Sequence, residues 1–125
     1  MKMKKYEFTG ETITIGERTL HRIRAVRDFG DVKAGDIGGW IEKEENLSHE
    51  GYCWVRDEAI VYGSALVCDN ATVCDDAIVC DEATVCDAAI VCDEATVRGA
   101  AIVCDEATVR SAALVCDNAT CVILR

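Results

Sequence analysis

Hydrophobic and polar positions recur with a period of six residues through the second half of the chain. Between residues 55 and 119, a valine opens each unit and an alanine stands four places later. A period of six keeps no single face of a 3.6-residue helix, whereas it fits short strands joined by bends. One unit is too small to bury a core alone, so the pattern predicts a solenoid of stacked units. The valines are Val55, Val61, Val67, Val73, Val79, Val85, Val91, Val97, Val103, Val109 and Val115.

The unit at residues 71–76 shows how each repeat is expected to fold. Ala71 and Val73 fall on one face of a strand, and Thr72 and Cys74 fall on the other. The two following aspartates remain for the bend. The first bend position of every unit is Asp, Gly or Ser, which are residues that tolerate left-handed or turn conformations, and no proline interrupts the series.

This repeat resembles the hexapeptide-repeat left-handed β-helix, in which an aliphatic residue is followed four places later by a small one. The resemblance implies an all-β, single-stranded, triangular β-solenoid with about 18 residues per coil, whose equivalent residues stack about 4.8 Å apart. The segment at 23–48, together with Cys53, Trp54 and Val55, looks like the N-terminal module of a bacterial and phage-associated β-solenoid family described as polymer-forming or YdcK-like. That resemblance implies a fold rather than an activity.

The first 54 residues differ from the repeats. Segments 6–8, 12–15 and 20–26 have the composition of short strands, with turns expected at Gly10 and at 16–18. These strands are expected to cap the first coil, which would otherwise expose an open edge. The sequence thus predicts an N-terminal β cap at 1–54 and a hexapeptide-repeat solenoid at 55–125.

Charge narrows the range of partners. The chain has a formal net charge of −10, and its repeat region carries many acidic residues but few basic ones, which argues against nucleic acid or an anionic membrane as a partner. No apolar run approaches the length of a membrane helix, and the polar stretch after Met1 lacks a signal core. A cytoplasmic protein is expected.

Cysteine is the most conspicuous outward residue. The chain has nine cysteines, no C-x-x-C pair, and seven cysteines at one repeat position, so reduced thiols are expected. On an 18-residue coil, Cys68, Cys86 and Cys104 form one stack that is a candidate for binding a soft metal ion or for redox chemistry. Parallel side chains on a flat face do not converge as tetrahedral zinc requires. The alternative is that cysteine serves as a small, strand-compatible residue copied with the repeat.

The bends supply a second candidate site. Asp57, Asp75 and Asp93 stack along one acidic ridge, which is expected to attract cations. A specific calcium site needs six to eight oxygen ligands around one point, and no loop supplies them. A solvated acidic edge is the alternative interpretation.

Catalysis is not expected from these residues. Acyltransferases that share the hexapeptide solenoid typically use a histidine at a trimer interface, and this chain has only His21 and His49, both before the regular coils. Their positions suggest an ordinary strand residue and a turn residue. The sequence therefore predicts a protein that is not an enzyme and has no cofactor.

The outward faces instead suggest association. They carry Ile78, Ile90 and Ile102, and the chain ends with the apolar residues Val122, Ile123 and Leu124. These six residues are candidate interface positions for a homo-oligomer, a filament or a protein partner. A last strand that folds over the open end would instead leave a monomer. The predicted function is a non-catalytic structural or scaffold protein, with a thiol-rich metal-binding or redox-sensitive protein as the alternative.

Overall fold

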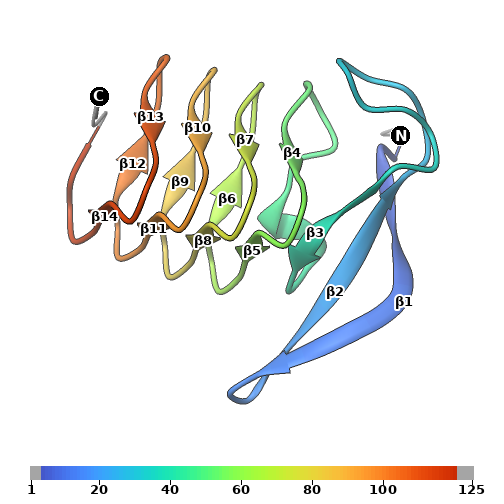
Figure 1. Cartoon of the computed structure of the whole chain (residues 1–125), viewed down its shortest axis with the longest axis horizontal. Coiled ribbons are helices and arrows are strands. Elements are labelled where there is room, and N and C mark those ends of the chain that lie inside the picture. Colours follow the sequence, from blue (N-terminus) through green and yellow to red (C-terminus); the bar gives the residue numbers. More distant parts are fainter. Residues whose placement is uncertain (1–3, 121–125) are drawn as a thin grey trace.

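The computed structural model describes residues 4–120 as a β-solenoid preceded by a long hairpin (Figure 1). The hairpin consists of β1 (Tyr6–Ile15) and β2 (Arg18–Ala25) and is followed by β3 (Ile37–Ile41). Among the described residues, the one helical segment is the 3-10 turn η1 (Glu44–Asn46). The prediction of an all-β protein is confirmed.

Two-residue strands then follow at intervals of six residues. They are β4 (Trp54–Val55), β5 (Ile60–Val61), β6 (Leu66–Val67), β7 (Thr72–Val73), β8 (Ile78–Val79), β9 (Thr84–Val85), β10 (Ile90–Val91), β11 (Thr96–Val97), β12 (Ile102–Val103), β13 (Thr108–Val109) and β14 (Leu114–Val115). Each is short because a bend follows after every strand.

Strands 18 residues apart pair in parallel, which confirms the predicted coil length. Ile60 pairs with Ile78, and Ile90 pairs with Thr108. Within the described residues the strands form three sheets, in the orders β1-β2-β3-β5-β8-β11-β14, β13-β10-β7-β4 and β12-β9-β6. The left-handed sense of the coil stays a prediction.

The inward positions form a continuous core. Val79 and Ala83 are completely buried, as are most of their equivalents along the repeat. Each buried valine contributes about 1.5 to 3 kcal/mol of gross hydrophobic stabilisation. Alanine at the second inward position leaves room for the backbone to turn, so the hexad specifies both the core and the corners.

A ladder of aspartates holds the corners together. The first bend residue of each unit has a positive φ, as at Asp75 with φ 59° and Asp87 with φ 57°. The Asp87 carboxylate accepts a hydrogen bond from the backbone N–H of Asp105 at 2.9 Å, and the N–H of Asp87 donates to Asp69 at 3.1 Å. Aspartate therefore combines tolerance of the left-handed conformation with a hydrogen bond to the next coil.

Replacing Asp87 separates these two roles. Asp87→Ala removes the acceptor and places a residue with a Cβ but no polar side chain in the left-handed region, so the free energy of unfolding should fall by about 2 kcal/mol. Asp87→Asn keeps both the conformational tolerance and an oxygen acceptor, and it should stay within about 1 kcal/mol of the parent. Urea unfolding of the two variants measures the difference, and equal stabilities would contradict a role for the ladder.

The hairpin joins the solenoid through β3. β2 pairs with β3 in antiparallel fashion, and β3 pairs with β5 in parallel, so one sheet runs from the hairpin into the coils. The separate strands predicted at 6–8 and 12–15 form one strand, whose register shifts between Phe8 and Thr12, where Gly10 has φ 98°. Stacking already includes Ile41 on Val61, upstream of the predicted boundary at residue 55. The division into two parts stays a prediction.

Two glycines allow β3 to lie close to the first coil. A Cβ atom at Gly38 would lie 2.6 Å from the Val55 carbonyl oxygen, and one at Gly39 would lie 2.6 Å from the Ala59 carbonyl oxygen. Real Cβ atoms do not approach backbone so closely. These positions therefore need glycine for backbone contact.

Candidate functional site

Both histidines of the chain stack on neighbouring aromatic residues of β1. The His49 ring stacks on Tyr6 with ring centroids 4.1 Å apart, and the His21 ring stacks on Phe8 at 4.4 Å. Tyr6 and Phe8 are two residues apart and point to the same side of the strand. We call His21, His49, Tyr6 and Phe8 the histidine face.

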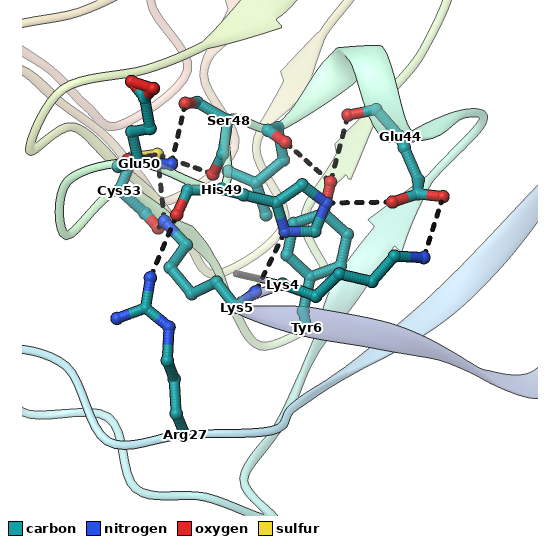
Figure 2. Close-up of polar contacts among 10 residues, drawn as sticks. Lys4, Lys5, Tyr6, Arg27, Glu44, Ser48, His49, Glu50 and Cys53 are labelled. Atoms are coloured by element: carbon teal, nitrogen blue, oxygen red, sulfur yellow. Dashed lines mark hydrogen bonds and ion pairs between the residues drawn. The ribbon is translucent and has the colours of Figure 1, made fainter. Parts of the chain in front are cut away.

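Polar contacts occupy both nitrogens of His49 (Figure 2). Its Nδ1 accepts the backbone N–H of Lys5 at 3.0 Å, and its Nε2 lies 2.9 Å from the Glu44 carboxylate. In the neutral ring, Nε2 therefore carries the hydrogen and donates a hydrogen bond to the Glu44 carboxylate. The hydrogen bond from His49 lowers the pKa of Glu44 below its usual range. His49 thus acts as a structural bridge between β1 and the first coil.

Tyr6 and Lys5 tie the same strand to the coil. The Tyr6 hydroxyl lies 2.6 Å from the Leu47 carbonyl oxygen, and burial raises the pKa of Tyr6. The completely buried Lys5 ammonium donates to the Cys53 carbonyl oxygen at 2.7 Å and lies 3.3 Å from the Cys53 sulfur. Burial lowers the pKa of Lys5. These contacts fix the position of the histidine face.

His21 differs from His49 because its ring nitrogens are available. The side chain is half-buried, and within residues 4–120 no hydrogen bond engages its ring. A neutral imidazole in this state can accept a proton from a bound molecule. Sequence reasoning had treated both histidines as ordinary residues, although the alternation of Tyr6 and Phe8 along one strand marks a common aromatic face.

An open groove lies on the other side of the β2–β3 pair. Arg22 pairs with Trp40 and lies over its ring, whereas His21 pairs with Ile41 of the core, so His21 faces away from the side that carries Arg22 and Glu42. The groove has a volume of about 690 Å³. Its lining residues are Arg18, Glu42, Lys43, Gly63, Ser64, Asp81 and Glu82.

The charges in this groove are largely engaged. Arg18 donates to Glu42 at 2.8 Å and lies over the Tyr62 ring, with 5.1 Å between the guanidinium carbon and the ring centroid. Glu42 also accepts the backbone N–H of Gly63 at 2.8 Å, which lowers the pKa of Glu42. The groove therefore offers a paired, polar surface rather than a strong field of one sign.

The predicted thiol stack is only partly present as free thiols. Cys68 and Cys86 are free, but Cys104 is in a disulfide, which corrects the expectation that all three are reduced. A disulfide sulfur is not a thiolate ligand, so Cys104 does not complete a metal site in this state. Burial raises the pKa of Cys68 to about 12. Metal binding by the stack stays a prediction.

The acidic ridge is engaged in backbone hydrogen bonding. The Asp57 carboxylate accepts the N–H of Asp75 at 3.1 Å, and the Asp75 carboxylate accepts the N–H of Asp93 at 3.0 Å. Asp93 in turn accepts the N–H of Ser111 at 2.9 Å. Sequence reasoning identified these residues as an edge but missed this structural role.

The three candidate interface residues that the structure describes do not form one patch. Ile78, Ile90 and Ile102 belong to β8, β10 and β12, which lie in three different sheets. Ile90 is 40% exposed, and the other two are half-buried. The remaining candidates, Val122, Ile123 and Leu124, lie outside the described residues.

Comparisons with known proteins change the functional interpretation. No family model matches the chain. The chain is 49% identical over 49 residues to the Escherichia coli K12 protein named "uncharacterized acetyltransferase YdcK". The match covers 38% of this chain and 15% of that protein. The YdcK-like resemblance is thereby supported, while the phage-associated and polymer-forming descriptions stay predictions.

This similarity corrects the prediction that the chain is not an enzyme. That prediction was based on the absence of a histidine from the regular coils, but the similar protein is named as an acetyltransferase. The structure also stacks both histidines on aromatic residues of β1, although they are far apart in sequence. Among the helices of the described part, none has the length and apolar character needed to cross a membrane.

Proposed function

We propose that this chain contributes to acetyl transfer, with His21 as the general base. The observation that carries the proposal is the available His21 ring, stacked on the same strand as the engaged His49 ring, in a solenoid similar to a protein named as an acetyltransferase. Hexapeptide acyltransferases typically use a histidine in their active site, and His21 is a histidine with available ring nitrogens. A homo-oligomer is part of the proposal, because such sites typically lie where subunits meet.

The step requires only proton transfer from the protein. An acceptor hydroxyl or amine attacks the carbonyl carbon of an acetyl thioester while the His21 imidazole takes the acceptor's proton. The new carbon–oxygen or carbon–nitrogen bond forms as the carbon–sulfur bond breaks, and the leaving thiolate receives the proton. A positioned base of this kind typically contributes 10²- to 10⁴-fold to the rate.

His49 has a different role in this proposal. Its Nδ1 and Nε2 are occupied by Lys5 and Glu44, so it orders the strand that carries Phe8 rather than accepting a substrate proton. It is a positioning residue. The two histidines therefore form a matched pair for mutagenesis.

Acetyl coenzyme A is the probe for this test. With a set of amino sugars, sugars and amino acids as acceptors, chromatography should detect coenzyme A release by the full chain, since the protein's own thiols interfere with thiol reagents. His21→Asn should lower the rate about 10²- to 10⁴-fold. His49→Asn should reduce the rate only as far as it reduces the folded fraction.

Circular dichroism gives the folded fraction of each variant. Equal rates for His21→Asn and the parent would exclude His21 as the base. Absence of turnover by the parent with every acceptor would count against acetyl transfer by this chain.

A further inference from the structure

The outward cysteines bring two free thiols and a carboxylate together on one face of the solenoid. Cys74 follows β7 and Cys92 follows β10, and these strands pair in parallel. The sulfur atoms of Cys74 and Cys92 and a carboxylate oxygen of Asp75 all lie within 4.8 Å of one another. Among the described clusters of this kind, this one holds two free thiols; another holds Asp69, Cys86 and Asp87, and a third includes the disulfide-bonded Cys104.

We propose that the thiolates of Cys74 and Cys92 bind one soft monovalent metal ion of the Cu(I) class, with the Asp75 carboxylate as a neighbouring negative charge. Soft thiolates select Cu(I), which is satisfied by few ligands. Two sulfur–metal bonds of about 2.3 Å on opposite sides of an ion span about 4.6 Å, close to the spacing of stacked strands. Tetrahedral zinc requires four converging ligands, and this cluster supplies three.

The charges around the cluster fit a cation of this kind. The Asp75 carboxylate adds negative charge beside the thiols, with 4.0 Å between one of its oxygens and the Cys74 sulfur. The same negative field attracts a metal ion, which must then displace the thiol protons. Binding is therefore expected to release protons and to weaken as the pH falls.

Arginines limit the cluster to a single pair of thiols. Eighteen residues before Cys74 stands Arg56, which contacts Asp31 at 3.0 Å. Eighteen residues after Cys92 stands Arg110, directly after β13, which pairs with β10. This column of residues 18 apart therefore offers one position for an ion, between Arg56 at one end and Arg110 at the other.

Cu(I) titration of the reduced full chain tests the proposal. Under anaerobic conditions, competition with a chromogenic Cu(I) chelator measures the number of ions bound and their affinity. The variant C74S/C92S should bind one ion fewer than the parent. The control C80S/C116S also removes two outward thiols, but Arg98 stands between them in their column, so it should bind as many ions as the parent.

Asp75→Asn provides a second variant that keeps both thiols and the acceptor for the Asp93 N–H. It should bind the same number of ions with about tenfold weaker affinity at this site, in line with the loss of a supporting charge beside the ligands. Equal uptake by C74S/C92S and C80S/C116S would overturn the proposal. Unchanged affinity in Asp75→Asn would remove the carboxylate from the site.

Discussion

Gly38→Ala is expected to lower the free energy of unfolding by about 3 kcal/mol, because overpacking a site walled by backbone leaves little room for relaxation. The new methyl group would lie 2.6 Å from the Val55 carbonyl oxygen and 2.7 Å from the Trp54 ring. Relief requires β3 to move away from the first coil, and β3 links the hairpin to β5. Urea unfolding followed by tryptophan fluorescence measures the loss, since Trp54 reports on this contact.

Gly16→Asn is the matched control. Gly16 has φ 60°, and a Cβ atom there would meet nothing within 4 Å. Asparagine tolerates this left-handed conformation, so the variant should stay within about 0.5 kcal/mol of the parent. If both variants were equally stable, close backbone packing at Gly38 would not be important for joining the hairpin to the solenoid.

The protein is also expected to lose stability steeply above about pH 8.5, the pH at which an unfolded cysteine thiol ionises. Burial raises the pKa of six thiols in the folded protein, and that of Cys68 and Cys74 reaches about 12. Between the unfolded and folded pKa values, the folded state holds more protons than the unfolded state, so stability falls as the pH rises. The six are Cys53, Cys68, Cys74, Cys80, Cys86 and Cys92.

The size of this effect follows from the number of protons. Each thiol that stays protonated adds a slope of up to about 1.4 kcal/mol per pH unit, reduced by solvent screening at the half-exposed positions. Lys5 acts in the opposite direction, because its lowered pKa makes stability rise with pH up to the unfolded value of 10.5. The expected net slope is negative because the thiols outnumber this lysine.

A serine variant isolates the contribution of the thiols. C68S/C74S should be less sensitive to pH than the parent in urea titrations at about pH 7.5, 8.5 and 9.5 under reductant, a range that brackets the pKa of an unfolded thiol. Comparison of the two slopes cancels the effects of Lys5 and of the tyrosines. Parallel pH profiles for the two proteins would show that these thiols are not the source of the alkaline instability.

The solenoid was predictable because each hexad specifies its own environment. Val79 and Ala83 are buried by neighbours that have the same pattern, so a local period determines a long-range structure. The left-handed conformation at the bends was likewise predictable from residue type. The hydrogen bond from one aspartate to the next coil was missed, although aspartates 18 residues apart carried that signal.

The histidine face was not predictable in the same way. Its contacts join residues near position 5 to residues near position 49, and no periodic pattern relates those segments. Lysine side chains are usually exposed to solvent. Lys5 is buried instead, and its ammonium group contacts the carbonyl oxygen and the sulfur of Cys53. The expectation that both histidines are ordinary residues followed from this gap, since their positions in sequence gave no indication that both stack on β1.

From residue 66 onward, threonine and aliphatic side chains alternate along each side of the coil, and this order affects how the solenoid can grow. Thr72 stacks on Ile90, and Ile90 stacks on Thr108. Along each side, the surface therefore alternates between threonine and an aliphatic residue, and this pattern repeats only after two coils. Duplication of a single coil would place like beside like and create a short apolar column, whereas duplication of two coils together would preserve the alternation. Duplication of two coils at a time would thus extend the solenoid without creating an apolar column on its sides.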